Sequence, residues 1–217
     1  MKPAPPTLLE MKVQLQKHQI DRLRGTYADL MEYPLYVNLA EFFFTDLYYV
    51  GDRTERNESF LKLYTHFEQL FGKVLLRGIH DLLEFHALSE DLDDDVARLL
   101  VKMGVGLGFT SEDYERAYRY ADNYPERVHQ IEIMEVNLYF VHRMSQRRII
   151  GVLLSTMQAT ARLLGASPMI DFLDRGYTAF RTVKDISYFV TTIKTREQTR
   201  LDRIYNDIPL DARFAGK

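Results

Sequence analysis

The stretch that decides the fold is Pro125–Ser145, PERVHQIEIMEVNLYFVHRMS. Its first residue is typical of a helix start, because a proline lacks the N–H that would be unpaired there in any case. Apolar residues then recur at helical spacing on several faces, as they do in a helix that is packed on more than one side. We therefore expect a helix over Glu126–Ser145 at the centre of a helical bundle.

The rest of the chain repeats this helical period in separate runs, divided by proline, glycine or capping residues. A second central helix is expected over Leu35–Val50, which is apolar nearly all round. No alternating run flanks an Asn-Gly or Asp-Gly pair, so we expect no sheet. The sequence thus predicts an all-α bundle of about eight helices. The other expected helices run from Thr7 to about Leu30, over 59–71, over 74–103 as one bent helix or two short ones, from Thr110, over 149–164, from Ser167 and over 186–205. Residues 51–58 are expected to form a surface loop.

Length and composition predict one domain. The chain has 217 residues, of which 46% are hydrophobic and 27% charged, and a chain of this length buries enough surface to fold unaided. No linker or internal repeat divides it, so residues 1–217 are one expected domain, with 1–6 and 207–217 loosely ordered. Because cysteine is absent, disulfides, thiolate metal sites and a cysteine nucleophile are excluded.

Charge and hydropathy narrow the expected location and partners. The formal net charge is −3, so the field of the whole molecule favours neither nucleic acid nor an anionic membrane, although a local basic patch would not be visible in that sum. No apolar run approaches the roughly 20 residues that cross a bilayer, and no export signal is visible. We expect a soluble, cytoplasmic protein of bacterial type, without a membrane partner.

A motif in the second central helix carries a family resemblance. Residues 42–48 read Phe-Phe-Phe-Thr-Asp-Leu-Tyr and resemble the Phe-Phe-Leu-Glu-Glu-Leu-Tyr signature of the bacterial FFLEELY-motif proteins. Leu82–Asp93 and Phe172–Arg181 are similar to further stretches of that family, in the same order. The resemblance implies an all-α fold and names no activity. Phe44 and Thr45 depart from the signature, and the loss of glutamate at position 45 puts in doubt any function that rests on a glutamate pair.

A polar stripe follows the central helix, at steps of three, three, four and three residues: His129, Glu132, Glu135, Tyr139 and His142. These side chains share one side of a helix. If that side faces inward, the carboxylates and imidazoles must be paired, protonated or bound to metal. If it faces water, they form a solvated stripe, and this is the favoured interpretation.

If the polar stripe faces inward, it would line a polar pocket between helices. Glu41, Thr45 and Tyr48 lie at i, i+4 and i+7 of the second central helix, and the helix over 74–103 is the third expected wall. Such a pocket would bind a small-molecule ligand. Its candidate lining residues are Glu41, Thr45, Tyr48, Glu132, Glu135, Tyr139 and His142. The favoured alternative is that the aromatic residues of the motif pack in the core.

Four residues are candidate metal ligands. Glu126 and His129 have the Glu-x-x-His spacing of bundle di-iron proteins, and His80 and Glu84 lie one turn apart in the helix over 74–103. A di-iron site needs that motif twice and two more glutamates, and the sequence holds it once. Ordinary pairing at the surface is the alternative for His80 and Glu84, and we expect no bound cofactor.

Two groups of basic residues remain. Arg143, Arg147 and Arg148 flank a helix boundary, where guanidinium groups could hold a phosphate or carboxylate, so these are the anion-binding candidates. The last helix also carries basic residues, but acids alternate with them, which favours a solvated face over a nucleic-acid site. A nucleic-acid partner is not expected.

Two classes of function follow, and the sequence does not decide whether the protein is an enzyme. The leading hypothesis is a non-enzymatic interaction or regulatory protein, with a homodimer through the heptad-like stripe Leu9–Leu30 of the first helix as one form. Docking of that stripe onto the chain's own bundle is the favoured alternative. The second hypothesis is a ligand-binding or metal-binding bundle protein, or an oxidoreductase, with the polar pocket described above.

Overall fold

A computed structural model describes residues 5–47, 73–163 and 165–214. The secondary structure in these ranges is helical, without a strand, which confirms the all-α class. None of the described helices combines the length and the apolar character that crossing a membrane requires. The helices are α1 Leu8–Thr26, α2 Ala28–Glu32, α3 Val37–Glu41, the π-helix η1 Phe42–Leu47, α5 Lys73–Lys102, α6 Ser111–Tyr120, α7 Tyr124–Ser145, α8 Arg148–Leu163, α9 Ser167–Arg181 and α10 Ser187–Asp207.

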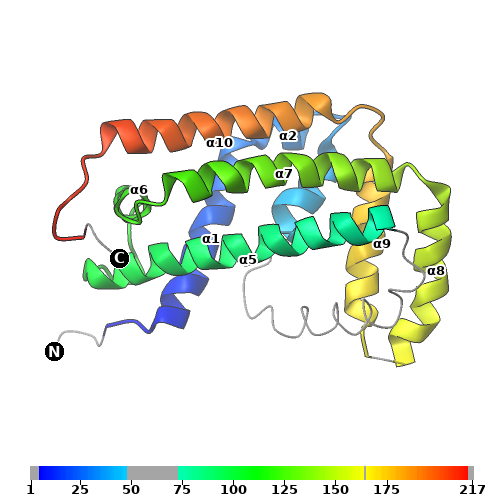
Figure 1. The fold of residues 1–217 in the computed structure, drawn as a ribbon, viewed down its shortest axis with the longest axis horizontal. Coiled ribbons are helices and arrows are strands. Elements are labelled where there is room, and N and C mark those ends of the chain that lie inside the picture. The colour runs from blue at the N-terminus through cyan, green and yellow to red at the C-terminus, as the bar shows by residue number, and fades with distance from the viewer. Residues whose placement is uncertain (1–4, 48–72, 164, 215–217) are drawn as a thin grey trace.

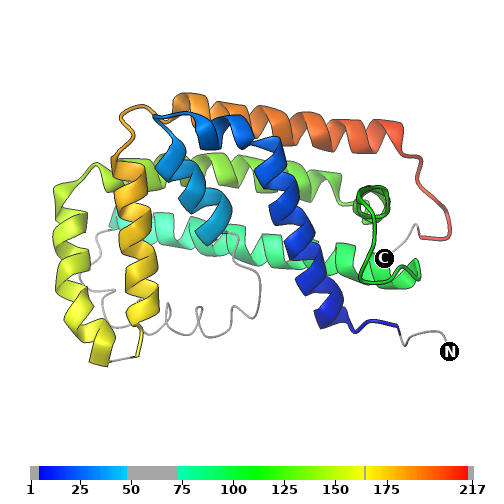
Figure 2. The same ribbon diagram turned by 180° about the vertical axis from the view of Figure 1, so that it is seen from behind.

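Helix α7 lies at the centre of the described bundle. It packs against α5 and α10, and these helices run side by side along the long axis of the molecule (Figure 1). Helices α8 and α9 form an antiparallel pair across one end, and both contact α7. Helix α1 packs against α5 and crosses it on the face that Figure 2 turns toward the viewer. The contacts of α7 with four neighbours explain why its apolar residues cover several faces.

Local signals set the helix ends. Thr7 and Thr110 each form a capping box, in which the threonine hydroxyl accepts a hydrogen bond from the backbone three residues on and a carboxylate accepts one in return. Residues 73–102 form one continuous helix, α5. The first helix ends at Thr26, earlier than expected, because Tyr27 leaves the helical region with φ −116°.

The buried face of α1 differs from the expected stripe. Leu9 is 69% exposed, whereas Met11 and Leu15 are fully buried, because it is the Met11 side of the helix that packs into the bundle. Farther along, Leu23 and Tyr27 belong to both the expected stripe and the core. Much of the stripe is therefore covered by the chain itself.

The three phenylalanines of the motif are buried. Phe42 packs against Phe172 and Phe180, and the Phe44 ring stacks on Tyr27 at 4.9 Å. Aromatic pairs of this kind add to the free energy gained by burying their area. The motif thus joins α1 and α9 in the core. Tyr48, the expected loop over 51–58 and the expected helix over 59–71 lie outside the described residues.

Helices α5 and α7 come together at a glycine. A Cβ atom on Gly78 would lie 2.0 Å from Cζ of Phe140, so only glycine fits without a shift of that ring. Polar contacts between α5 and α7 also fix the relative position of the two helices. Asn137 donates its Nδ2 hydrogen to the Asp81 carbonyl at 3.2 Å, and Gln130 donates to the Ser89 hydroxyl at 2.9 Å.

A charged pair joins α1 to α10 inside the bundle. The two Nη atoms of Arg22 donate to the two oxygens of Glu197 at 2.9 and 3.0 Å, and the Tyr27 hydroxyl donates to the same carboxylate at 2.7 Å. These side chains are largely buried, 19% and 18% exposed for the ion pair. Burial alone would raise the pKa of Glu197, but the charge of Arg22 and the hydrogen bonds from Arg22 and Tyr27 hold that pKa below its usual value.

The glycine contact makes a first prediction. Gly78→Ala should lower the free energy of unfolding by about 1–3 kcal/mol, because the added methyl group overpacks the contact with Phe140. Urea unfolding followed by circular dichroism measures the change. Gly25→Ala is the control, since nothing lies within 4 Å of its Cβ position and alanine is the better helix former. A Gly78→Ala variant as stable as the parent would contradict the close contact.

The buried pair makes a second prediction, on pH. Because the pKa of Glu197 is lower in the folded state, its contribution to stability is complete above the usual glutamate value of 4.5 and is lost as the pH falls below it, through the folded pKa. Glu197→Leu should cost about 3 kcal/mol at pH 7, because Arg22 is left unpaired.

The control for this prediction is the double variant Arg22→Leu/Glu197→Leu, which removes both charges. It should recover most of the loss and show a weaker dependence on pH between 3 and 5 in urea unfolding. An unchanged dependence on pH in the double variant would show that other groups cause it.

Candidate functional site

The polar stripe of α7 divides among three neighbours instead of lining one pocket. His129 lies beside Glu84 of α5, Glu135 forms an ion pair of 2.6 Å with Lys194 of α10, and Nε2 of His142 lies 2.9 Å from the Val183 carbonyl. Glu132 is exposed and Tyr139 is half-buried. The structure therefore does not bring these five side chains together.

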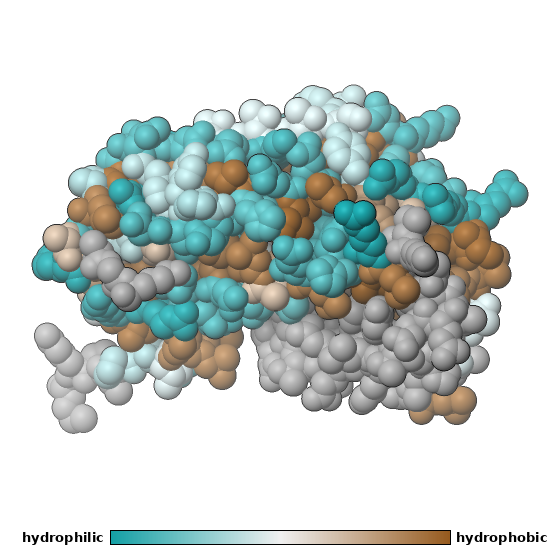
Figure 3. Space-filling model, in the orientation of Figure 1, coloured by the Kyte–Doolittle hydropathy of each residue, from teal (hydrophilic) through white to brown (hydrophobic). Residues whose placement is uncertain are grey.

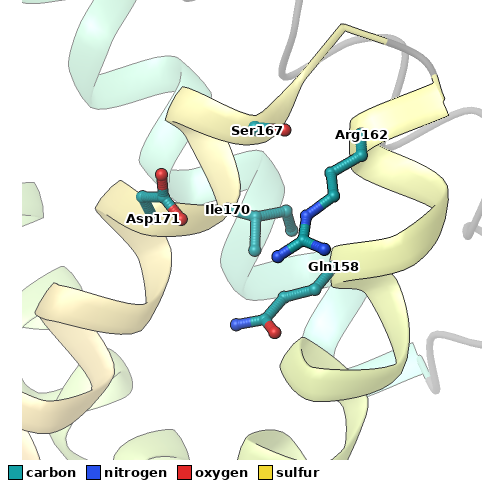
Figure 4. Close-up of a pocket in the computed structure, with 5 residues that line it drawn as sticks. All are labelled: Gln158, Arg162, Ser167, Ile170 and Asp171. Carbon is teal, nitrogen blue, oxygen red and sulfur yellow. The ribbon is translucent and has the colours of Figure 1, made fainter.

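The pocket residues expected on the second central helix do not line a pocket in the described structure. Glu41 is exposed at the end of α3, and the side chain of Thr45 and all of Tyr48 lie outside the described residues. A cavity of about 60 Å³ does lie between α8 and α9, far below the roughly 300–1,000 Å³ of ligand pockets. Figure 4 shows Arg162 and Asp171 on opposite sides of Ile170 there. None of the expected pocket residues lines it; its lining consists of Gln158, Arg162, Ser167, Ile170 and Asp171.

A cluster of metal-ligating side chains lies on the outer side of the α5–α7 contact. His80, Asp81 and Glu84 of α5 each offer one ligand atom, and these atoms all lie within 4.8 Å of one another. His129 approaches from α7, with Nε2 3.4 Å from Oε1 of Glu84. We call these four residues the α5–α7 cluster.

Its position follows from the helix geometry and from the contact beside it. His80 and Glu84 are separated by four residues, and Asp81 and Glu84 by three, so one face of α5 carries them all. The glycine contact at Gly78 sets the distance to α7, and the Asn137 bond to the Asp81 carbonyl sets the register. The cluster is open to water: the side chains of His129 and Glu84 are 52% and 48% exposed.

Three of the four predicted ligands belong to the cluster, and one does not. His80 and Glu84 offer ligand atoms within 4.8 Å of each other, and His129 lies beside Glu84, whereas Glu126 is exposed outside the cluster. The Glu-x-x-His pair of α7 is replaced by a cross-helix set because the His129 ring lies against α5. Sequence reasoning missed Asp81, although its place between His80 and Glu84 on the same turn was a usable signal.

The anion-binding candidates lie at another place, the turn from α7 to α8. Arg143, Arg147 and Arg148 are exposed there. Hydrogen bonds from Gln146 to the carbonyls of Phe180 and Val183 bring the end of α9 to the same place, which adds two exposed cations that sequence reasoning missed. We call the group the arginine end; it consists of Arg143, Arg147, Arg148, Arg181 and Lys184.

The fold and the cluster define a class: an all-α bundle protein with a histidine–carboxylate cluster between two packed helices. Residues 2–210 match the model of a family described as a domain of unknown function, DUF8198, and the chain belongs to this family. No curated protein and no solved structure matches the chain. The resemblance to the FFLEELY-motif proteins stays a prediction.

Proposed function

We propose that the protein is a metal-binding helical-bundle protein that holds a divalent first-row transition metal at the α5–α7 cluster. The observation that carries the proposal is that an imidazole from α7 reaches a carboxylate of a three-ligand group on α5. A metal bound by His129 and by α5 residues would join the two helices. The function is thus binding, in line with a regulatory protein whose state follows metal supply.

The spacing of the donor atoms supports this proposal. Zinc binds nitrogen and oxygen at about 2.0–2.2 Å, so two neighbouring ligands of a tetrahedral site lie about 3.3–3.6 Å apart. Nε2 of His129 and Oε1 of Glu84 are 3.4 Å apart, a separation longer than the usual N–H···O distance of about 2.9 Å. The separation is therefore compatible with two ligands of one ion, and without an ion the two atoms lie within hydrogen-bonding distance.

A second carboxylate stands behind His129. Oε2 of Glu132 lies 4.0 Å from Nδ1, on the side of the ring away from Glu84. Metal-bound histidines usually donate their other N–H to a carboxylate, which fixes the tautomer and makes the ligand more basic. A small rotation of the exposed Glu132 side chain would complete this arrangement.

The donor set also selects the kind of metal. Two imidazoles and two carboxylates suit zinc, iron(II), manganese(II) or cobalt(II), whereas calcium and magnesium prefer oxygen ligands alone. Because the cluster is open to water, an ion can enter from solution and keep water in the remaining positions. Zinc is the probe of choice, since it imposes no geometry of its own.

The test is the effect of zinc on stability. Metal that binds only the folded state stabilises it by about 2.7 kcal/mol when its concentration is 100 times the dissociation constant. Protein stripped with a chelator should therefore unfold at a higher temperature when zinc is added. His129→Ala and Glu84→Gln should each weaken zinc binding, measured by calorimetric titration, by about tenfold or more.

Glu126→Gln is the matched control. It removes a carboxylate from the same helix, three residues from His129 but outside the cluster, and should bind zinc as the parent does. The proposal is wrong if zinc leaves the parent's unfolding temperature unchanged, or if His129→Ala and Glu84→Gln bind zinc as tightly as Glu126→Gln does.

A further inference from the structure

We infer that the arginine end, together with the outer face of α8, is a peripheral docking surface for an anionic phospholipid bilayer. The inference is independent of the metal site, because it uses none of the cluster residues. The cations of the arginine end are not paired with carboxylates of the described residues.

The arginine end gathers several exposed cations that have no ion-pair partner among the described residues. None of its five cations forms an ion pair with a described residue, and Arg181 donates to the Tyr177 hydroxyl and lies over the ring of the same tyrosine. The nearby Asp185 is engaged as an acceptor for the Ser187 backbone. The exposed Arg77 and Arg162 also lack an ion pair with a described residue. Most other described arginines meet carboxylates: Arg22 with Glu197, Arg98 with Asp95, Arg116 with Asp113, Arg119 with Asp122, Arg196 with Asp29, Arg203 with Glu115 and Arg213 with Asp211. Unmatched positive charge attracts an anionic surface.

Aliphatic side chains protrude beside these charges. Ile149 and Val152 in the first turns of α8 are 66% and 60% exposed, and Leu163 at the far end of the helix is 88% exposed, while Leu154 and Met157 on the other side of the helix are buried. Figure 3 shows hydrophobic and hydrophilic surface side by side at the end of the molecule that α8 covers. A helix that combines exposed aliphatic residues with neighbouring arginines is suited to the interface between lipid headgroups and acyl chains.

The combination of charge and exposed aliphatic residues favours a bilayer over other anionic partners. An acidic protein segment would pair with the arginines but would supply no apolar phase for the exposed aliphatic side chains of α8. Nucleic acid would leave the protruding aliphatic residues against its phosphates without a contact. A bilayer accepts both features, since phosphates face the arginines and the interface takes up the aliphatic groups.

Vesicle sedimentation tests the inference, with the full chain and a chelator present so that metal binding has no influence. The chain should sediment with vesicles of equal parts phosphatidylglycerol and phosphatidylcholine, and not with phosphatidylcholine alone. Each cation near the surface contributes about fivefold to binding, so Arg143→Gln/Arg147→Gln/Arg148→Gln should weaken it about a hundredfold. The control Lys17→Gln/Arg98→Gln/Arg213→Gln removes the same charge from exposed sites elsewhere and should have little effect.

A second variant separates lipid insertion from simple charge attraction. Ile149→Ser/Val152→Ser keeps every cation and should still weaken vesicle binding several-fold, with an unchanged circular dichroism melt. The inference is overturned if the parent does not bind the anionic vesicles or if both triple variants lose binding equally. It is also overturned if Ile149→Ser/Val152→Ser binds as the parent does, or if the arginine triple affects binding of a single-stranded RNA and leaves vesicle binding unchanged.

Discussion

The contact between α5 and α7 at Gly78 and Phe140 is the constraint on which the described structure depends. The aromatic ring occupies the space that any side chain at position 78 would need, so the two helices approach closely. This approach places His129 opposite Glu84 and Asn137 against the backbone of Asp81. It also leaves the remaining faces of α7 for α8, α9 and α10. The close contact at Gly78 thus lies in the same pair of helices that carries the proposed metal site.

Charge is distributed unevenly around this framework. The Arg22–Glu197 pair joins the first and last helices in the interior, and its free energy depends on both charges remaining together. Most other arginines of the described surface meet a carboxylate, whereas those at the turn from α7 to α8 do not. The buried ion pair and the exposed cations at the turn from α7 to α8 therefore lie in separate regions of the molecule.

Several features were predictable from the sequence because they depend on local chemistry. The caps at Thr7 and Thr110, the central place of α7 and the all-α class all follow from residue type and spacing. Contacts between distant segments were not predictable in this way. The Arg22–Glu197 pair joins residues 175 positions apart, and His129 meets α5 rather than Glu126 because helix packing, not spacing along one helix, decides which side chains face each other. Asp81 is different, because its place between His80 and Glu84 on the same turn of α5 was a local signal.

Crystals grown from chelator-treated protein, soaked in zinc and measured at the zinc absorption edge, test the central claim most directly. The account predicts one strong anomalous peak at the α5–α7 cluster, within bonding distance of Nε2 of His129 and of at least two ligand atoms from His80, Asp81 and Glu84. A zinc ion held by α5 alone, with His129 turned away, or a peak elsewhere in the molecule, would contradict it.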